Sequence, residues 1–158
     1  MTDTVTPSAS TSWVSPVTIV ATLAAVGVAA GGILHFQIWN DRYRGSKLPD
    51  GVVPGAWVVK KGFPINSALS IILAVTLLAF AFAFIPRIGR FAVLAAGALE
   101  LGSIVFLVLS REASIFGWKE TGWDVDAKRV LVVEIVSGLL LAAALVLDMR
   151  RAGITDEV

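Results

Sequence analysis

The sequence predicts an all-α fold, a polytopic membrane protein whose four transmembrane helices form an antiparallel bundle. Four long apolar runs cover residues 16–39, 65–85, 91–110 and 130–147, and nearly every charged residue falls between them. At about 1.5 Å of rise per residue, each run reaches or approaches the roughly 30 Å of a bilayer's hydrocarbon core. Charged residues make up only 16% of the chain, against about 25% in soluble domains, so lipid is the expected solvent.

The segments outside the runs predict two tails around one domain. Residues 1–14 are rich in Ser and Thr and predict a disordered polar tail. Pro16 suits the first turn of the first helix, because the N–H that it lacks would have no helical partner there. We expect residues 15–148 to form the four-helix transmembrane domain and residues 149–158 to form a short C-terminal tail.

The connections between the runs differ in length. Residues 40–64 (loop 1) contain Pro49, Pro54 and Pro64, and a short surface or re-entrant segment is expected within them. Residues 86–90 predict a tight turn, which makes the second and third helices antiparallel neighbours. Residues 111–129 (loop 3) mix charges of both signs with turn-forming glycines.

Composition excludes several kinds of function. The chain has no cysteine, which removes disulfides, thiol redox chemistry, iron–sulfur ligation and cysteine zinc sites. Its net charge of +1 gives no basic face for nucleic acid. With one histidine and no phosphate-binding glycine loop after a strand, we predict no cofactor, no metal and no catalytic residue, and an enzyme is the least favoured function.

Charge and aromatic residues indicate how the helices sit in a plasma (cytoplasmic) membrane. Loops 1 and 3 lie on one side and carry nine Lys and Arg residues, whereas the other side carries four. This difference favours cytoplasmic loops 1 and 3 with both termini outside. Aromatic rings at the headgroup level are the expected interfacial anchors: Trp39, Tyr43, Trp57, Trp118 and Trp123 at the loop side, and Trp13 opposite.

Small residues four apart predict where helices approach closely. Helices in lipid gain little from burying apolar surface and associate through such positions. The predicted helix-packing residues are Gly27, Gly31, Ala98, Gly102 and Gly138. Packing within the bundle explains them, and a homodimer face at Gly27 and Gly31 is the alternative.

Three ionisable residues lie inside the predicted spans, where such groups are costly and seldom face lipid. Counting from the span ends places His35 and Glu134 near the loop side and Glu100 near the midplane. Ser103 lies one turn after Glu100, and Asn66 begins the second span. These five residues are the candidate site, a polar chamber that opens toward loops 1 and 3 with Glu100 as its floor. The alternative is structural, with Glu134 meeting a loop cation and His35 an interfacial hydrogen bond.

Two short patterns carry a resemblance. Gly32, His35 and Trp39 close the first helix, and Phe116, Gly117 and Glu120 follow the third, with Glu134 early in the fourth. With four spans, this layout resembles small actinobacterial four-helix membrane proteins of unassigned function and is loosely similar to the DoxX-like group. The resemblance implies the same fold class and no particular reaction. Loop 1 is longer and richer in proline than the resemblance implies.

Two functions fit these features. The first is an accessory or scaffold subunit of a larger membrane complex, because the chain is small, lacks a soluble catalytic domain and has small-residue helix faces. The alternative is a protein that handles a small molecule, a lipid or quinone, or protons in the chamber of His35, Glu100 and Glu134. The expected partners are the lipid bilayer, a membrane protein or a second copy of the chain, and a lipid or quinone.

Overall fold

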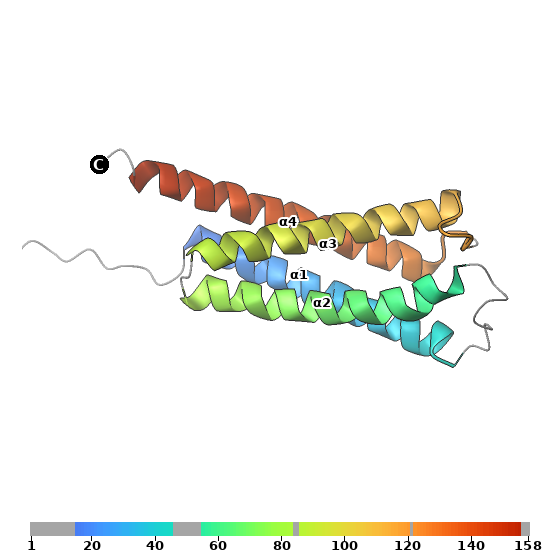
Figure 1. Cartoon of the computed structure of the whole chain (residues 1–158). Coiled ribbons are helices and arrows are strands. Elements are labelled where there is room, and N and C mark those ends of the chain that lie inside the picture. The colour runs from blue at the N-terminus through green and yellow to red at the C-terminus, as the bar shows by residue number, and fades with distance from the viewer. Residues whose placement is uncertain (1–14, 46–54, 84–85, 121, 156–158) are drawn as a thin grey trace, which may run out of the picture.

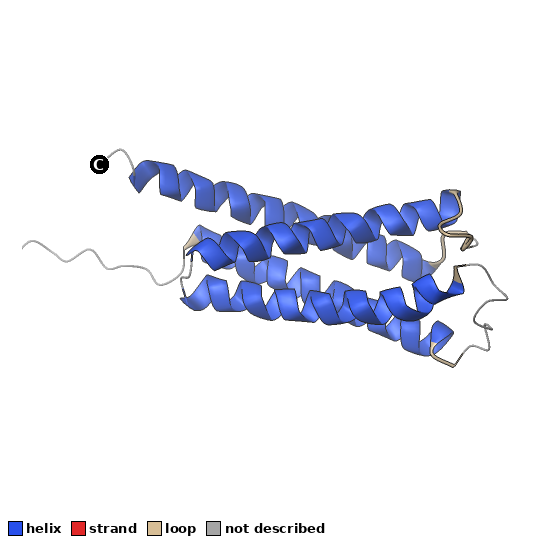
Figure 2. Cartoon of the chain, viewed as in Figure 1, coloured by secondary structure: helices blue, strands red, loops and turns tan. Residues whose placement is uncertain are grey.

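In the computed structural model the chain folds into four long helices (Figure 1). The structure describes residues 15–45, 55–83, 86–120 and 122–155. The helices are α1 (Pro16–Ile38), which continues into the π-helical turn η1 (Trp39–Tyr43), then α2 (Ala56–Ala83), α3 (Pro86–Glu112) and α4 (Val125–Thr155). Only short loops separate the helices among the described residues (Figure 2).

The helices form one antiparallel bundle. α1 packs against α2 and α4, and α3 packs against the same two helices, so α1 and α3 lie at diagonal corners. The ends of α1 and α3 meet the starts of α2 and α4 at one end of the bundle, here called the loop end (Figure 1). The opposite end, where α1 begins and α4 ends, is called the terminus end.

Each helix contains a segment long and apolar enough to cross a membrane. These segments are Pro16–Tyr43, Ala56–Ala81, Gly89–Glu112 and Val125–Ala152. Large apolar side chains face outward from the bundle, for example Ile72, Leu101 and Leu139, each more than half exposed. Such a surface suits lipid, and the predicted fold of a multi-pass, all-α four-helix bundle is confirmed.

The helix boundaries differ from those predicted. α2 begins at Ala56 and includes Pro64, so part of the predicted loop 1 is helical. α3 begins at Pro86, so residues 86–90 form its first turns. α4 runs to Thr155, well into the predicted C-terminal tail. The predicted tail 1–14 lies outside the described residues.

Pro64 is accommodated within α2 by a hydrogen bond from another helix. Proline has no N–H, so it cannot donate to the carbonyl of Lys60 one turn earlier. The indole Nε1 of Trp39 donates to that carbonyl at 3.0 Å. The bond supplies the donor that proline removes and ties the end of α1 to the start of α2.

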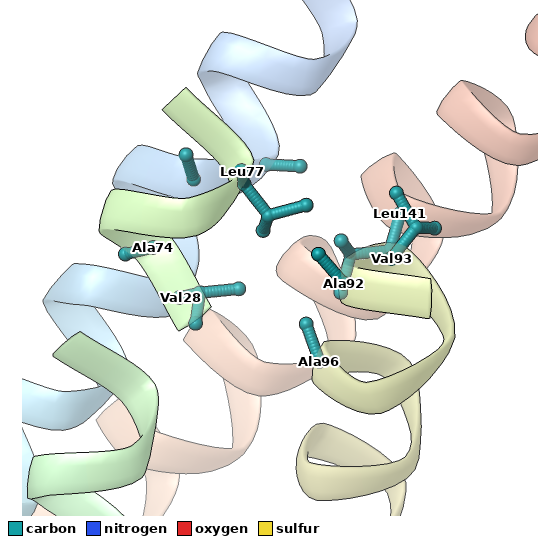
Figure 3. Close-up of a cluster of buried hydrophobic side chains, with 9 residues drawn as sticks. Val28, Ala74, Leu77, Ala92, Val93, Ala96 and Leu141 are labelled. Atoms are coloured by element: carbon teal, nitrogen blue, oxygen red, sulfur yellow. The ribbon is translucent and has the colours of Figure 1, made fainter. Parts of the chain in front are cut away.

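The terminus half of the bundle is packed with small and branched apolar side chains. Its core contains Val28, Ala74, Leu77, Ala96 and Leu141, which come from all four helices (Figure 3). Close approach sets the helix spacing, because a Cβ built on Gly27 would lie 2.5 Å from the Oγ of Ser137 on α4. Glycine at position 27 therefore favours the close approach of α1 and α4, since an added Cβ would force the Ser137 hydroxyl to move.

Candidate functional site

Polar side chains from all four helices meet in one network in the loop half of the bundle. The Ser70 hydroxyl of α2 lies 3.2 Å from Asn66 Oδ1, and Asn66 Nδ2 donates to Ser103 Oγ of α3 at 3.0 Å. Ser103 Oγ lies 3.2 Å from Nε2 of His35 on α1. His35 Nε2 in turn lies 3.5 Å from Oε1 of Glu134 on α4. The network therefore joins all four helices beside a small apolar cluster of Leu107, Ala127 and Val130.

The backbone assigns the tautomer of His35. Its Nδ1 lies 2.9 Å from the carbonyl oxygen of Gly31. A carbonyl only accepts, so Nδ1 carries the hydrogen, and Nε2 of the neutral ring is an acceptor. The donors then run in one direction, from Ser70 through Asn66 and Ser103 to His35 and Gly31. In this arrangement the Nε2 lone pair faces the Ser103 hydroxyl at 3.2 Å, the Asn66 Nδ2 at 3.4 Å and the Glu134 carboxyl at 3.5 Å.

The two glutamates are enclosed by the bundle. Glu100 is 4% exposed and Glu134 is 2% exposed. Oε2 of each is buried and has no hydrogen-bond partner among the described residues. The two carboxyls are near enough to interact electrostatically. Glu134 lies against His35, so the predicted pairing with a loop cation is replaced by a contact inside the membrane-spanning part.

A cavity of about 290 Å³ lies between α2 and α3 in front of this network. His35, Asn66 and Ser103 line its polar wall, and Phe63, Leu69 and Phe106 are among its apolar lining. Glu100 and Glu134 are not among its lining residues, so they stand behind the polar wall. The expectation that Glu100 forms the floor of the chamber is therefore wrong in detail, because the ring of His35 and the Ser103 hydroxyl reach the cavity first.

The loop-end mouth of the cavity is charged. Arg111 and Glu120 both line it. The Arg111 guanidinium donates to the carbonyls of Leu107 and Gly122, each at 3.1 Å, and lies over the ring of Trp123. The Tyr43 hydroxyl donates to Glu120. These bonds hold both charges at the mouth.

A tight turn in loop 3 covers the start of α2. Phe116 and Gly117 both have positive φ, 51° and 86°, and the turn pairs Ile115 with Trp118. Trp118 packs on Gly55, where a Cβ would lie 2.7 Å from the Trp118 Cβ and where φ is +76°. Glycine at position 55 is needed for both reasons. The turn fixes loop 3, and with it Glu120, over the mouth of the cavity.

The predicted packing residues fall into two groups. Gly27 meets Ser137, and a Cβ on Gly31 would lie 3.9 Å from both Glu100 Oε1 and Val133 Cγ1, so these glycines lie between helices of one bundle. Within the described residues, a Cβ on Gly102 or Gly138 would meet nothing within 4 Å. Ala98 and Gly102 instead line the cavity.

The predicted aromatic anchors also take different roles. Trp57 is 54% exposed and lies against exposed Phe116, with ring centroids 5.8 Å apart. Tyr43 is buried, because its hydroxyl reaches Glu120 and its ring packs on Phe63 and Trp118.

Trp39, Trp118 and Trp123 lie partly inside the loop end, each in the contact described above. The expectation of a lipid-facing ring at Tyr43 is therefore wrong. Trp13 lies outside the described residues.

Sequence reasoning missed several parts of the site. Phe63, Leu69 and Phe106 line the cavity, and nothing in their spacing singles them out from other apolar residues of the spans. Glu120 and Arg111 could have been predicted from their position, because they lie in loop 3, toward which the predicted chamber opens. Gln37, which has a depth similar to that of His35, is exposed on the outer face of α1.

Metal ligation finds little support in this cluster. Among the described residues, no group of three or more His, Asp or Glu side chains is placed to hold a metal ion. Comparisons of the chain with protein families, with curated proteins and with solved structures give no match. The resemblance to small DoxX-like membrane proteins stays a prediction.

Proposed function

We propose that this integral membrane protein binds a small amphipathic molecule, of the lipid or quinone class, in the cavity between α2 and α3. The observation that carries the proposal is the cavity of about 290 Å³, in which apolar walls converge on His35, Asn66 and Ser103. Ligand sites are typically apolar hollows with a few well-placed polar groups that fix orientation.

Cavity size and position favour a ligand that is only partly enclosed. Its volume lies at the low end of the roughly 300–1,000 Å³ of small-molecule sites, which suits a head group or a single ring. Ile65 and Leu69 line the cavity and are 58% and 43% exposed, so an apolar tail can continue between α2 and α3 into lipid. The ligand would enter from the bilayer and place its polar head against the network.

The polar wall favours a neutral head group. His35, Asn66 and Ser103 offer hydrogen bonds without a fixed charge. The two buried carboxyls behind them disfavour an anion by repulsion. Arg111 is held by its bonds to Leu107 and Gly122. A carbonyl- or hydroxyl-bearing head group fits these surroundings better than a phosphate does.

An accessory subunit of a larger membrane complex is the second candidate. The surface of α3 supports it, because a Cβ on Gly97 or Gly102 would meet no other atom within 4 Å among the described residues. A partner helix approaches closely at such positions. Gly102 also lines the cavity, so the two candidates must be separated by experiment.

Purification in mild detergent, with mass spectrometry of bound lipids and proteins, tests the proposal. Wild type should carry a specific lipid-soluble molecule, and Gly102→Leu, which fills the cavity, should lose it. Gly138→Leu is the matched control, because position 138 is equally free of neighbours and lies outside the cavity.

Ser103→Ala separates the two candidates. It removes a head-group contact inside the cavity and leaves the outer α3 surface unchanged. Loss of the small molecule with Ser103→Ala supports the binding proposal. A stoichiometric protein partner that survives Ser103→Ala and is lost with Gly102→Leu, without any bound small molecule, would replace it by the accessory role.

We also propose an orientation for the protein in a bacterial plasma membrane, with the loop end facing the cytoplasm. The chain has no native cysteine, so single cysteines report on topology without background. Lys119→Cys and Arg150→Cys lie at opposite ends of the bundle, and both positions are exposed. In intact cells, a membrane-impermeant maleimide should label position 150 and leave position 119 unlabelled. The opposite pattern would reverse the orientation.

A further inference from the structure

The structure assigns a proton-binding site to the contact between His35 and Glu134, behind the wall of the cavity. His35 Nδ1 donates to Gly31, so the neutral ring presents a lone pair at Nε2. That atom lies 3.5 Å from Glu134 Oε1. Two acceptors that face each other repel, and one proton between them turns the contact into a hydrogen bond. The proton sits either on the carboxyl or on the imidazole.

Glu100 enlarges this site to a cluster of three titratable groups. With a neutral ring and two ionised carboxyls the cluster would carry two negative charges inside the bundle. Charge inside hydrocarbon is expensive unless it is paired or neutralised. Oε2 of Glu100 and Oε2 of Glu134 are buried and accept no hydrogen bond from the described residues. Protons bound within the cluster reduce its negative charge and supply hydrogen bonds that the neighbouring side chains do not provide.

The charged groups around the cluster come from every neighbouring element. α1 contributes His35, α3 contributes Glu100, and α4 contributes Glu134. The groups of α2 that face them, Asn66 and Ser70, are uncharged. At the mouth stand Tyr43, Arg111 and Glu120, which also line the small cavity described next. Titration of the cluster therefore belongs to the three groups together.

A second, smaller cavity gives this cluster a route to water. It has a volume of about 20 Å³, enough for one water molecule, and its lining includes His35, Tyr43, Glu120, Asp124 and Asp126. The last two residues lie at the start of α4 near the surface of the loop end. His35 thus forms a wall shared by both cavities. A proton from water at the loop end reaches the His35 ring through this space, and Glu134 through that ring.

Among the residues that the structure describes in the terminus half, no matching polar cavity is found. Behind the cluster lies the apolar core of Val28, Leu77, Ala96 and Leu141, which come from the four helices (Figure 3). Proton exchange therefore occurs with one side of the membrane only, and the site binds a proton without conducting it across.

Ligand binding is coupled to this proton through Ser103, a step that rests on the proposed function. Ser103 has one hydroxyl hydrogen, and in the free protein its neighbouring acceptors are His35 Nε2, at 3.2 Å, and the Glu134 carboxyl. A carbonyl ligand that accepts this hydrogen withdraws it from Nε2. The Asn66 amide, whose Nδ2 lies 3.4 Å from Nε2, then stays as a more distant donor to that atom, and a proton taken up from the loop end replaces the lost bond. A ligand with an accepting head group binds with proton uptake, and its affinity falls by up to about tenfold per pH unit as pH rises.

His35 allows a direct test, because it is the one histidine in the chain. Full-length protein with a histidine-free affinity tag is labelled with ¹⁵N-histidine and placed in phosphatidylcholine nanodiscs. Between about pH 5 and 8, the Nδ1 signal should stay that of a protonated nitrogen and the Nε2 signal should shift. An Nε2 signal that does not move, or a ring protonated at Nε2 with a bare Nδ1, overturns the proposal. This test needs no mutation.

Infrared spectroscopy of the protonated carboxyl band assigns the partner of His35. Glu134→Gln should remove a titrating band, whereas Glu112→Gln, at an exposed position outside the cluster, should leave it. Ser103→Ala mimics ligand binding by removing the donor to Nε2, so the protonated state should persist to higher pH. Equal titration in wild type, Glu134→Gln and Ser103→Ala would refute both the site and the coupling.

Vesicles that contain a pH-sensitive dye test the one-sided route. Wild type should add no proton leak across the membrane, and a leak would contradict the sealed terminus half. These measurements use no ligand, so they stand apart from the test of the cavity. An empty cavity with a titrating His35 would remove the proposed function and leave the proton site. A bound lipid together with a His35 signal that does not titrate would support the proposed function and remove the proton site.

Discussion

The two halves of the bundle differ in how their helices are joined, although a small apolar cluster of Leu107, Ala127 and Val130 also packs in the loop half. In the terminus half, Gly27 brings α1 against Ser137, and alanine, valine and leucine fill the core. In the loop half, α2 and α3 leave a cavity of about 290 Å³, and hydrogen bonds from Asn66 to Ser103 and on to His35 join the helices. Close packing in lipid leaves no room for a ligand, whereas polar contacts hold helices together and leave space between them.

The largest effect on stability is expected when a carboxyl is introduced into the apolar half of the bundle. Leu141 is 2% exposed within the core cluster. Leu141→Glu should destabilise the protein by roughly 2.5–3.5 kcal/mol, the cost of a central acidic residue on insertion scales. Unfolding in increasing SDS measures the change, with Leu141→Met as the volume-conserving control. If both variants unfold at the same SDS fraction, the halves do not differ as we describe.

The next effect concerns close approach in the terminus half. Gly27→Leu should cost about 1–3 kcal/mol or more, because its side chain would overlap Ser137 and overpacking carries costs of this size. Gly138→Leu should cost much less in the same SDS assay, since nothing lies within 4 Å of a Cβ there. Gly27→Ala combined with Ser137→Gly should recover stability relative to Gly27→Ala alone. Equal losses for both leucine variants would disprove the α1–α4 contact.

A smaller effect is expected from the bond between Trp39 and the carbonyl of Lys60 at the loop end. Trp39→Phe removes the donor and should cost about 0.5–1.5 kcal/mol. In the Pro64→Ala background the helix regains its own N–H at position 64, so Trp39→Phe should cost little. A double-mutant cycle of unfolding free energies measures the coupling. Additive costs would show that the indole does not compensate for the proline.

The smallest effect is expected at the surface of the loop end, where Asp124 caps α4. The Ala127 N–H donates to Asp124 Oδ1 at 2.8 Å, and this bond, followed by Arg42, holds the pKa of the Asp124 carboxyl below its ordinary value of 3.8. A lowered pKa stabilises the fold above the ordinary value, and the gain is lost as pH falls through the folded-state pKa.

Asp124→Asn keeps a cap and loses the charge, so it tests this dependence directly. It should be slightly less stable than wild type at pH 7, and the difference should shrink as pH falls from the ordinary value of 3.8 through the lowered pKa of Asp124. Unfolding in detergent across this pH range measures it. A constant difference across the range would assign the effect to hydrogen bonding alone.

Much of the fold follows from composition, because a span in lipid must be long and apolar. The positions of Leu77, Ala96 and Leu141 inside the spans are fixed by that requirement. The start of α2 is different. Proline usually marks a helix end, and the donor that keeps Pro64 inside α2 comes from Trp39, far away in the sequence.

The candidate site divides in the same way. Depth along each helix follows from counting residues, which is why Asn66, Ser103, His35 and Glu134 were expected in one half of the membrane. The rotation of each helix does not follow from counting, and it decides that Glu134 faces His35 rather than a loop cation. The cavity itself depends on how far α2 and α3 stand apart, a quantity that belongs to the packed bundle.

The hydrogen bond from Trp39 to the carbonyl of Lys60 also has an evolutionary consequence. A lineage that replaces Pro64 regains the helical N–H, and selection for an indole at position 39 is then relaxed. A lineage that loses the indole first lacks this donor to the Lys60 carbonyl until the proline is also replaced. Substitutions at positions 39 and 64 should therefore occur together in related sequences, with the change at position 64 coming first.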